Sequence, residues 1–246
     1  MPKGNGGRHV EIRLQPWPKT IPEAIETQRR LRGRIRTVDD AEHAVRTVAG
    51  VDVAYERDGD RLAAAAVVLD YASLEVVETS TVIATAEFPY EPGLFAFREL
   101  PALVEALREL ATTPDLIVCD GHGLAHPRRF GLACHLGLLA DVPTFGVAKT
   151  VFVGEFVPPA SRRGAWSPLT VGDEGWGNGE NIGAVVRTRD GVKPVFVSVG
   201  HRISLDTARA HTITLSRHAR LPETTRRADH LSREVLAGRI SPSVGR

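Results

Sequence analysis

Cysteine is scarce in this chain of 246 residues, which has only Cys119 and Cys134, each inside an apolar run. Two isolated thiols exclude the disulfide framework of a small secreted protein and are typical of a reducing cytoplasm. Long apolar runs are also missing, since the longest spans residues 62–69 and ends at Asp70, well short of the roughly 18 residues that a membrane span needs. Residues 1–10 are polar and glycine-rich and lack the apolar core of a signal peptide. We therefore expect a cytoplasmic protein without a membrane segment.

Lysine is the second scarce residue. Of the 31 basic residues only four are lysine, which leaves 27 arginines. The sequence alone leaves two explanations open: genome composition, or contact with phosphate groups, for which the planar guanidinium is well suited. In so arginine-rich a chain a retained lysine stands out. The four are Lys3, Lys19, Lys149 and Lys193.

Net charge is nearly absent, because 31 basic residues face 30 acidic ones and leave +1. The total argues against a strongly basic nucleic-acid binder, but it hides an uneven layout. Residues 1–36 carry +6, residues 37–120 carry −12, and residues 121–246 carry +7. Two basic flanks therefore enclose an acidic centre, which is compatible with a polyanion held by a basic surface next to a cation site.

The apolar pattern predicts one mixed sheet with helices on its faces. Three closely spaced strands at 48–55, 62–69 and 75–86, with a turn at Asp58–Gly59, favour an antiparallel meander. Strands and helices then alternate, which favours parallel pairing. We expect a flexible arm at 1–19, a single domain at 20–240 and a flexible end at 241–246. The other expected elements are helices at 20–36, 94–110, 130–139, 204–215 and 223–237, strands at 115–119, 144–148 and 194–199, and loops with a hairpin between 149 and 183.

Three acidic residues stand where simple packing would not place them. Asp52 interrupts an apolar strand, Asp120 directly follows one, and Glu99 lies among apolar residues of an expected helix. A buried carboxylate is costly unless it is paired or binds a metal ion, and clusters of such oxygens bind Mg²⁺ or Mn²⁺. The alternative is that each acid is stabilised separately and no shared site exists. Asp52 would then form a salt bridge, Glu99 would pair with an arginine or lie on an outer face, and Asp120 would be a turn residue.

The segment 120–131 combines glycine, histidine and arginine. Glycine lets the backbone approach a ligand closely, histidine can act as an acid, a base or a hydrogen-bonding group, and arginine can hold phosphate. The alternatives are a plain strand-to-helix turn, or a zinc site, which lacks a supporting cysteine pair. The candidate residues are Gly121, His122, Gly123, His126, Arg128 and Arg129.

Further candidates lie at strand ends and in one turn. Lys149 ends a short strand, where its ammonium would lie beside the tip of the preceding strand, or it is a surface lysine. His201 ends another strand, and Asp206 opens the next helix, where an acid also suits the helix dipole. Residues 89–93 form a rigid turn that presents Tyr90, or an ordinary loop with a packed tyrosine.

Taken together, these pieces resemble the endonuclease V family of DNA repair nucleases. Singly, only the segment that begins at Asp120 is specific; as a set, recurring in the family's order between residues 20 and 215, they are strong. The matching stretches are Val48-Ala-Gly-Val-Asp-Val, Pro89-Tyr-Glu-Pro-Gly-Leu-Phe-Ala-Phe-Arg-Glu, Asp120-Gly-His-Gly-Leu-Ala-His-Pro-Arg-Arg-Phe-Gly, Gly146-Val-Ala-Lys and Val199-Gly-His-Arg-Ile-Ser.

The resemblance implies an α/β, ribonuclease H-like fold, in which a three-strand antiparallel meander and parallel strands form a mixed sheet flanked by helices. It implies a Mg²⁺-dependent endonuclease, with Mn²⁺ able to substitute, that recognises deoxyinosine, the product of adenine deamination in DNA. Such an enzyme cuts the second phosphodiester bond on the 3′ side of the lesion. We expect 3′-hydroxyl and 5′-phosphate ends, and we expect the protein to act as a monomer.

The resemblance also assigns catalytic roles to positions of this chain. Lys149 is the expected basic residue near the scissile phosphate. His201 is expected as a further polar residue at the metal site, with Asp206 as an addition to it. The expected metal ligands are Asp52, Glu99 and Asp120.

Contacts to the substrate are carried over in the same way. Tyr90, in a turn with Pro92 and Gly93, is the expected wedge that fills the gap when the base is extruded from the duplex. Glu91 departs from the family, whose turn usually has an apolar residue there, and this difference bears on strand separation rather than on the chemistry. The expected contacts in the pocket for the base and beside it are Gly121, His122, Gly123, His126 and Arg128.

Two alternatives to this function stay open at the level of the sequence. One is an inosine-specific ribonuclease that acts on single-stranded RNA. The other is a non-catalytic binder of deaminated or branched DNA. The intact carboxylate set argues against the binder, because buried acids repel phosphate.

Overall fold

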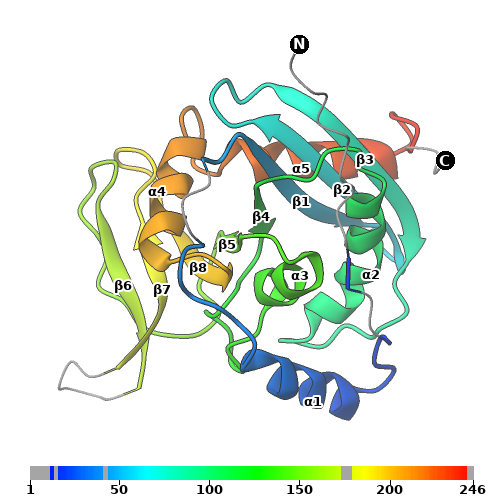
Figure 1. Cartoon of the computed structure of the whole chain (residues 1–246), viewed down its shortest axis with the longest axis horizontal. Coiled ribbons are helices and arrows are strands. Elements are labelled where there is room, and N and C mark those ends of the chain that lie inside the picture. The colour runs from blue at the N-terminus through cyan, green and yellow to red at the C-terminus, as the bar shows by residue number, and fades with distance from the viewer. Residues whose placement is uncertain (1–11, 14–15, 41–43, 173–178, 243–246) are drawn as a thin grey trace.

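One mixed sheet organises the part of the chain that the computed structural model describes, which comprises residues 12–13, 16–40, 44–172 and 179–242 (Figure 1). The eight strands lie in the order β3-β2-β1-β4-β5-β8-β7-β6. The strands are β1 (Thr47–Tyr55), β2 (Arg61–Asp70), β3 (Val76–Thr85), β4 (Leu116–Asp120), β5 (Thr144–Ala148), β6 (Trp166–Val171), β7 (Glu180–Val186) and β8 (Val195–His201). The helices are α1 (Ile21–Arg32), α2 (Phe95–Arg108), α3 (Leu132–Ala140), α4 (Leu205–Leu215) and α5 (Glu223–Leu236).

Strands β1, β2 and β3 form the antiparallel meander that the sequence predicts. Val51 pairs with Ala66 across β1 and β2, and Ala66 pairs with Ser80 across β2 and β3. Residues 62–69 of β2 are buried throughout, because α2 packs on one face of this strand and α5 on the other. The apolar run that ends at Asp70 is therefore a strand covered on both sides.

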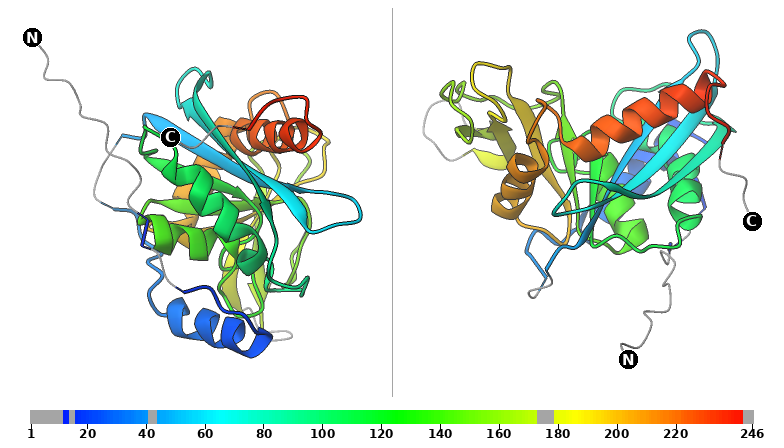
Figure 2. Two further views of the ribbon diagram at one scale, coloured as in Figure 1. Left: turned by 90° about the vertical axis from the view of Figure 1, so that its right-hand side faces the viewer. Right: turned by 90° about the horizontal axis from the view of Figure 1, so that it is seen from above.

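Helices cover both faces of the sheet (Figure 2). Helices α2 and α3 pack on the face that contains Ala49, Val51 and Ile117. Helices α4 and α5 pack on the opposite face, where Val48 and Val118 lie in the same apolar cluster as residues of these helices. The architecture is thus the α/β sandwich of helices around a mixed sheet that the sequence predicts.

Helix α5 rests directly on β1, with no side chain between them at one point. A Cβ atom on Gly50 would lie 2.2 Å from the carbonyl carbon of Thr224. Only glycine permits this close approach of helix to strand. The contact fixes the position of α5 above the residues that follow Gly50 along the strand.

Helix α1 begins at the expected capping box, in which Thr20 and Glu23 cap each other's backbone, and it ends at Arg32 rather than at residue 36. Part of the arm expected at residues 1–19 makes contacts with the rest of the domain. Ile12 and Trp17 pack against the core, and the Arg13 amide donates a 2.8 Å hydrogen bond to a carbonyl of α3. Residues 1–11, 14–15 and 243–246 lie outside the described residues. No helix among those described is long and apolar enough to cross a membrane.

The direction of each strand decides which residues meet at an edge of the sheet. β1, β4 and β5 run parallel, so their carboxyl ends lie at one edge. β8 runs antiparallel to β5, with Phe196 opposite Ala148 and His201 opposite Thr144. The carboxyl end of β8 therefore lies at the other edge of the sheet.

Candidate active site

Two carboxylates lie side by side where the parallel strands end. β1 and β4 pair in register at Val51 and Cys119, so Asp52 and Asp120 occupy the next position on neighbouring strands. Both belong to the sheet face that α5 covers, because side chains alternate along a strand. Glu99, one turn into α2, approaches from the helix layer of the other face, and its charge interacts with both. The structure thus brings the three predicted acids together.

Crowding changes the acidity of these groups. Burial, and then the charges of Asp120 and Asp229, raise the pKa of Asp52 to about 7. Burial, and then the charges of Asp52 and Asp120, raise the pKa of Glu99 to about 8. Like charges in a desolvated space oppose each other's ionisation, so the carboxylate cluster favours binding of a cation.

Asp229, on α5, is a fourth carboxylate at the site, and the sequence analysis missed it. Its charge raises the pKa of Asp52, so it faces the same space from above the sheet. Asp229 also pairs with Arg233 at 2.8 Å, one turn further along α5. An acid four residues before an arginine in a helix is typical of a surface ion pair, which is why the sequence did not single it out.

Ser232, also on α5, orients one of the acids. Its hydroxyl is buried and donates a 3.1 Å hydrogen bond to Oδ2 of Asp52. Hydrogen bonds of this kind hold a ligating carboxylate in one rotamer. Sequence periodicity could have placed Ser232 on the buried face of the helix, but it gave no reason to connect it with Asp52.

Lys149 lies where the sequence predicts, just beyond β5. Its Nζ is 2.6 Å from Oδ2 of Asp120. Burial opposes the charge on Lys149, but its bond to Asp120 and the charges of Asp120 and Asp229 outweigh that effect and raise its pKa. The residue is therefore a charged ammonium held at the carboxylate cluster.

The carboxylate oxygens face one space, but they are not arranged as the ligands of a metal ion. Within the described ranges, no three His, Cys, Asp or Glu side chains lie close enough together to hold a metal ion. The donor set nevertheless fits a hard divalent cation: it consists of carboxylates only, and two of them have pKa values raised by burial and mutual repulsion.

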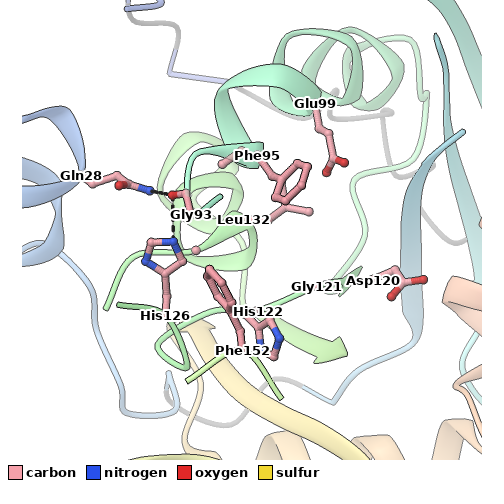
Figure 3. A pocket seen from close by; sticks show the side chains of 12 residues that line it. Gln28, Gly93, Phe95, Glu99, Asp120, Gly121, His122, His126, Leu132 and Phe152 are labelled. Atoms are coloured by element: carbon pink, nitrogen blue, oxygen red, sulfur yellow. Dashed lines mark hydrogen bonds between the residues drawn. The ribbon is translucent and has the colours of Figure 1, made fainter. Parts of the chain in front are cut away.

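A cavity of about 230 Å³ opens beside Glu99 and Asp120 (Figure 3). Its volume lies below the roughly 300–1,000 Å³ of pockets for drug-sized ligands, so it suits a single flat ring system. Phe95, Leu132 and Phe152 supply apolar walls. Backbone groups and two histidines line the rest, including the predicted residues Gly93, Gly121, His122 and His126.

The backbone after β4 packs closely against β8. A Cβ atom on Gly123 would lie 1.9 Å from the carbonyl oxygen of Val199, and the Gly123 amide donates a 2.8 Å hydrogen bond to the hydroxyl of Ser198. Gly123 therefore shapes the cavity from behind, since it does not line it. Burial lowers the pKa values of His122 and His126 to about 4, so both rings are neutral near pH 7 and act through hydrogen bonds.

The turn that presents Tyr90 is anchored at the carbonyl oxygen of Gly93. Nδ1 of His126 accepts from the Arg128 amide, so its Nε2 carries the proton and donates to Gly93 at 2.9 Å. The Arg128 guanidinium donates to the same oxygen, also at 2.9 Å. Gln28, from α1, adds a third donor at 2.9 Å. Gln28 is fully buried, and the sequence analysis did not identify it.

Tyr90 itself projects from this turn, with 68% of its surface exposed. Its ring packs edge-on against that of Phe95, with centroids 4.7 Å apart. Pro92 is exposed beside it. Glu91 lies near enough to Arg128 for their charges to attract, which gives the unexpected carboxylate a cationic neighbour within the protein.

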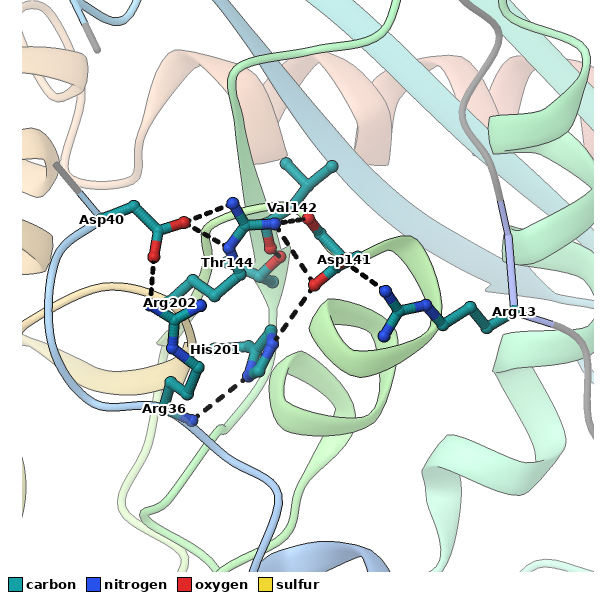
Figure 4. Close-up of polar contacts among 8 residues, drawn as sticks. All are labelled: Arg13, Arg36, Asp40, Asp141, Val142, Thr144, His201 and Arg202. Atoms are coloured by element: carbon teal, nitrogen blue, oxygen red, sulfur yellow. Dashed lines mark hydrogen bonds and ion pairs between the residues drawn. The ribbon is translucent and has the colours of Figure 1, made fainter. Parts of the chain in front are cut away.

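His201 does not lie with the carboxylates, and its predicted place at the metal site is wrong. The antiparallel pairing of β8 puts it opposite Thr144, at the other edge of the sheet. There it is buried, its Nδ1 accepts from the Arg36 amide at 3.3 Å, and its Nε2 lies 3.7 Å from Asp141 (Figure 4). It belongs to a network of ion pairs in which Arg202 joins Asp141 to Asp40.

Asp206 is likewise distant from the cluster, so its predicted addition to the metal site is also wrong. It lies in the first turn of α4, beyond the carboxyl end of β8. Its side chain is 88% exposed and pairs with Arg209 at 2.5 Å. The alternative explanation, an acid that suits the helix dipole, accounts for it.

A second hollow, of about 550 Å³, lies on the other side of the acids. Asp52, Lys149 and Asp229 line it together with Arg57 and Arg233. The carboxylates therefore stand between an apolar cavity and a groove that carries basic side chains. That arrangement suits a substrate with one flat ring and a charged backbone.

Comparison with known proteins agrees with this picture. The model of the family described as Endonuclease V matches residues 29–230. The chain is 51% identical over 222 residues to Endonuclease V of Streptomyces avermitilis, covering 89% of this chain and 94% of that one. It is 49% identical over 217 residues to Endonuclease V of Trichormus variabilis, covering 88% and 96%.

Solved structures show the same likeness. The crystal structure of Endonuclease V from Streptomyces avermitilis superposes with a TM-score of 0.84 at 49% identity, covering 94% of this chain and 99% of that chain. The catalytic domain of human Endonuclease V gives 0.82 at 33% identity, covering 91% and 98%. Endonuclease V of Ciona intestinalis, in complex with a 24mer DNA containing an inosine followed by a ribo-adenosine, gives 0.77 at 27% identity, covering 89% and 98%.

Proposed function

The chain belongs to the endonuclease V family of nucleases, and from this premise we propose that it is a Mg²⁺-dependent deoxyinosine 3′ endonuclease of DNA repair. It binds DNA that contains deaminated adenine and hydrolyses the second phosphodiester bond 3′ to the lesion. The products carry 3′-hydroxyl and 5′-phosphate ends. Mn²⁺ replaces Mg²⁺ in the reaction.

One observation carries the proposal: the small apolar cavity and the carboxylate cluster adjoin, and Glu99 and Asp120 line the cavity. A base extruded from the duplex needs an apolar slot with a few polar groups, and cleavage nearby needs acids that hold a cation. Both lie near the edge of the sheet at which the pairing of β1 with β4 ends. The complex of the Ciona intestinalis relative with inosine-containing DNA supports the proposal that the ring in the cavity is the base of inosine.

The residues divide the chemistry between them. Asp52, Glu99, Asp120 and Asp229 would hold the cation, since each is a carboxylate that faces the shared space. A bound Mg²⁺ supplies an activated water and neutralises charge that develops on the phosphate. Lys149, kept charged beside Asp120, stabilises negative charge on the scissile phosphate.

Recognition of the base rests on the cavity and the turn. The neutral rings of His122 and His126 and the backbone of Gly121 offer hydrogen bonds, which can distinguish the carbonyl of hypoxanthine from the amino group of adenine. Tyr90, exposed at the tip of its turn, takes the place of the extruded base and offsets the lost stacking.

The test is cleavage of a duplex with a single inosine, with Mg²⁺ or with EDTA, beside an otherwise identical duplex with adenine. We expect one nick, at the second bond 3′ to inosine, only with inosine and metal, and extension of the new end by a polymerase. An uncut inosine strand at ample enzyme and Mg²⁺ contradicts the proposal. A single-stranded RNA with the same sequence and inosine forms the third arm, and faster cleavage of RNA than of DNA makes the protein a ribonuclease instead.

A further inference from the structure

Arg220 lies in the connection between α4 and α5 and holds three backbone carbonyls at once. Its Nε donates to the oxygen of Lys193 at 2.9 Å, and its Nη2 donates to those of Pro194 and Lys149, each at 2.8 Å. We propose that Arg220 is a positioning residue for Lys149: by gripping the Lys149 carbonyl, it fixes the backbone from which the ammonium reaches Asp120. The inference rests on the function proposed above.

Lys149 needs such a support because the sheet no longer holds it. The ladder between β5 and β8 ends at Ala148 opposite Phe196. Lys149 follows this last pair, and its side chain is 43% exposed. Ordering a lysine side chain already opposes about 2 kcal/mol of rotamer entropy. If the backbone of Lys149 moved as well, the ammonium would leave its place 2.6 Å from Asp120.

Arginine suits this task better than lysine. The three carbonyls come from two separate segments, one beyond β5 and one at the start of β8. The planar guanidinium points several N–H groups in fixed directions, so one side chain can tie both segments together. An ammonium in its place would act as a point charge and could not span them in the same geometry.

Arg220 is itself anchored. Its carbonyl oxygen accepts a 2.7 Å hydrogen bond from the hydroxyl of Thr188, which is fully buried. Helix α5, which carries Asp229, begins at Glu223, three residues further along. The connection between α4 and α5 therefore has two links to the site. It leads into the helix that carries Asp229, and through Arg220 it holds the backbone of Lys149.

The variants are Arg220→Met, which removes the donors, and Arg220→Lys, which keeps the charge but loses the fork. Arg217→Met is the matched control, because Arg217 lies in the same connection and donates to Ala72, on the far side from Lys149. In single-turnover cleavage of inosine DNA we expect both Arg220 variants to be about 10- to 100-fold slower, the loss that misplacement of a catalytic group typically causes. Half-saturation by DNA should change little, and Arg217→Met should match the wild type.

A double-mutant cycle separates positioning from general stabilisation. If Arg220 acts through Lys149, Arg220→Met should cause no further loss when added to Lys149→Gln. A loss of the same size in both backgrounds overturns the proposal. So does a wild-type rate in the Arg220 variants, or a change confined to DNA affinity.

A readout without activity keeps this inference distinct from the proposed function. Hydrogen exchange of the backbone over residues 149–153 should be faster in both Arg220 variants than in the wild type and in Arg217→Met. Failure of the wild type to cut inosine DNA refutes the proposed function and leaves this readout intact. Unchanged exchange in the Arg220 variants refutes the support of Lys149 itself.

Discussion

The side-chain nitrogen of Gln28 donates a 2.9 Å hydrogen bond to the carbonyl oxygen of Gly93. Helix α1 is thereby fastened to the turn that exposes Tyr90, 65 residues further along the chain. The same Gln28 nitrogen donates to the carbonyl of Phe130 at 3.0 Å, and Arg128 donates to the Gln28 oxygen. One buried amide therefore joins the wedge turn to the segment that lines the cavity.

Replacement of Gln28 by leucine should loosen this junction. Buried donors and acceptors that lose their partner cost about 1–3 kcal/mol, so we expect the free energy of unfolding to fall by that amount. Discrimination between inosine and adenine should fall as well, because Tyr90 loses its fixed turn. Denaturant unfolding and cleavage of the two duplexes measure the effects. Glu26→Ala, on the exposed side of the same helix, is the control, and equal effects of both changes would contradict the role of Gln28.

Replacement of Asp120 by alanine should abolish cleavage and preserve binding of inosine DNA. Asp120 pairs with Lys149, and its charge interacts with that of Asp52, so its loss removes a site for the cation, whereas the apolar walls of the cavity remain. We expect a rate decrease of at least ~10²-fold, as for loss of other electrostatic catalytic groups. Single-turnover cleavage and a binding assay in Ca²⁺ measure the two quantities. Asp206→Ala, an acid far from the cluster, should cleave like the wild type; a matching loss in it would restore Asp206 to the site.

Replacement of Ser232 by alanine should weaken the use of metal without stopping the reaction. The hydroxyl orients Asp52, and loss of such a partner typically costs about 10- to 100-fold in metal affinity. We expect the Mg²⁺ concentration for half-maximal cleavage to rise by about that factor, with a near-normal rate at saturating metal. A metal titration of the cleavage rate measures it. Ser167→Ala, in β6, serves as the control, and an unchanged titration curve for Ser232→Ala would refute the role.

Stability should depend on pH through the crowded acids. The pKa values of Asp52 and Glu99 are raised in the folded protein to about 7 and about 8, whereas an exposed carboxyl has a pKa of about 4. Below pH ~4 both carboxyl groups are protonated in the folded and in the unfolded state, so they make no difference to stability. Between pH ~4 and ~8 the unfolded chain has lost these protons while the folded protein still holds them, so the free energy of unfolding falls as pH rises. In metal-free buffer we expect a lower melting temperature at pH 8.5 than at pH 6.

The same acids allow a sharper check of this slope. Asp52→Asn should raise the melting temperature at pH 8.5 and flatten the dependence on pH, and added Mg²⁺ should raise the melting temperature of the wild type by mass action. A slope that is equally steep in Asp52→Asn would show that other groups cause it.

Replacement of Tyr90 by alanine should change selectivity more than stability. The ring is mostly exposed, so its loss should shift the melting temperature by little, as surface changes do. Without the wedge, extrusion of the base loses its compensation, and the preference for inosine over adenine in duplex DNA should narrow. The preference should be preserved by Tyr90→Trp. An unchanged ratio in Tyr90→Ala would make this residue an ordinary part of the loop.

The sequence predicted the acids at strand ends but not the edge of the sheet to which each strand end belongs. Asp52 interrupts one apolar strand and Asp120 ends another, and these two strands are parallel neighbours, so the two acids meet. His201 ends a strand with the same pattern, but β8 is antiparallel to β5. The resemblance implied a place for His201 at the metal site, and hydrophobic periodicity could not correct this because it carries no information on strand direction.

Two other residues were beyond the reach of sequence patterns for different reasons. Asp229 makes the ion pair with Arg233 that its spacing suggests, so nothing in the helix distinguishes its second role at the site. Gln28 occupies the buried side of an amphipathic helix, but its partners, Gly93 and Phe130, lie far away in the sequence. Long-range contacts of this kind appear only once the chain is folded.

The close contact between Thr224 and Gly50 also bears on when the carboxylate cluster is completed during synthesis of the chain. Helix α5 is the last element in the described chain, and folding on the ribosome proceeds from the amino end. A nascent chain that stops before residue 223 already contains Asp52, Glu99 and Asp120, but it lacks the helix that carries Asp229 and covers the strand. Such a chain lacks the contact between Gly50 and Thr224, and Asp229 joins the other three carboxylates only after this helix has been made and has packed on β1.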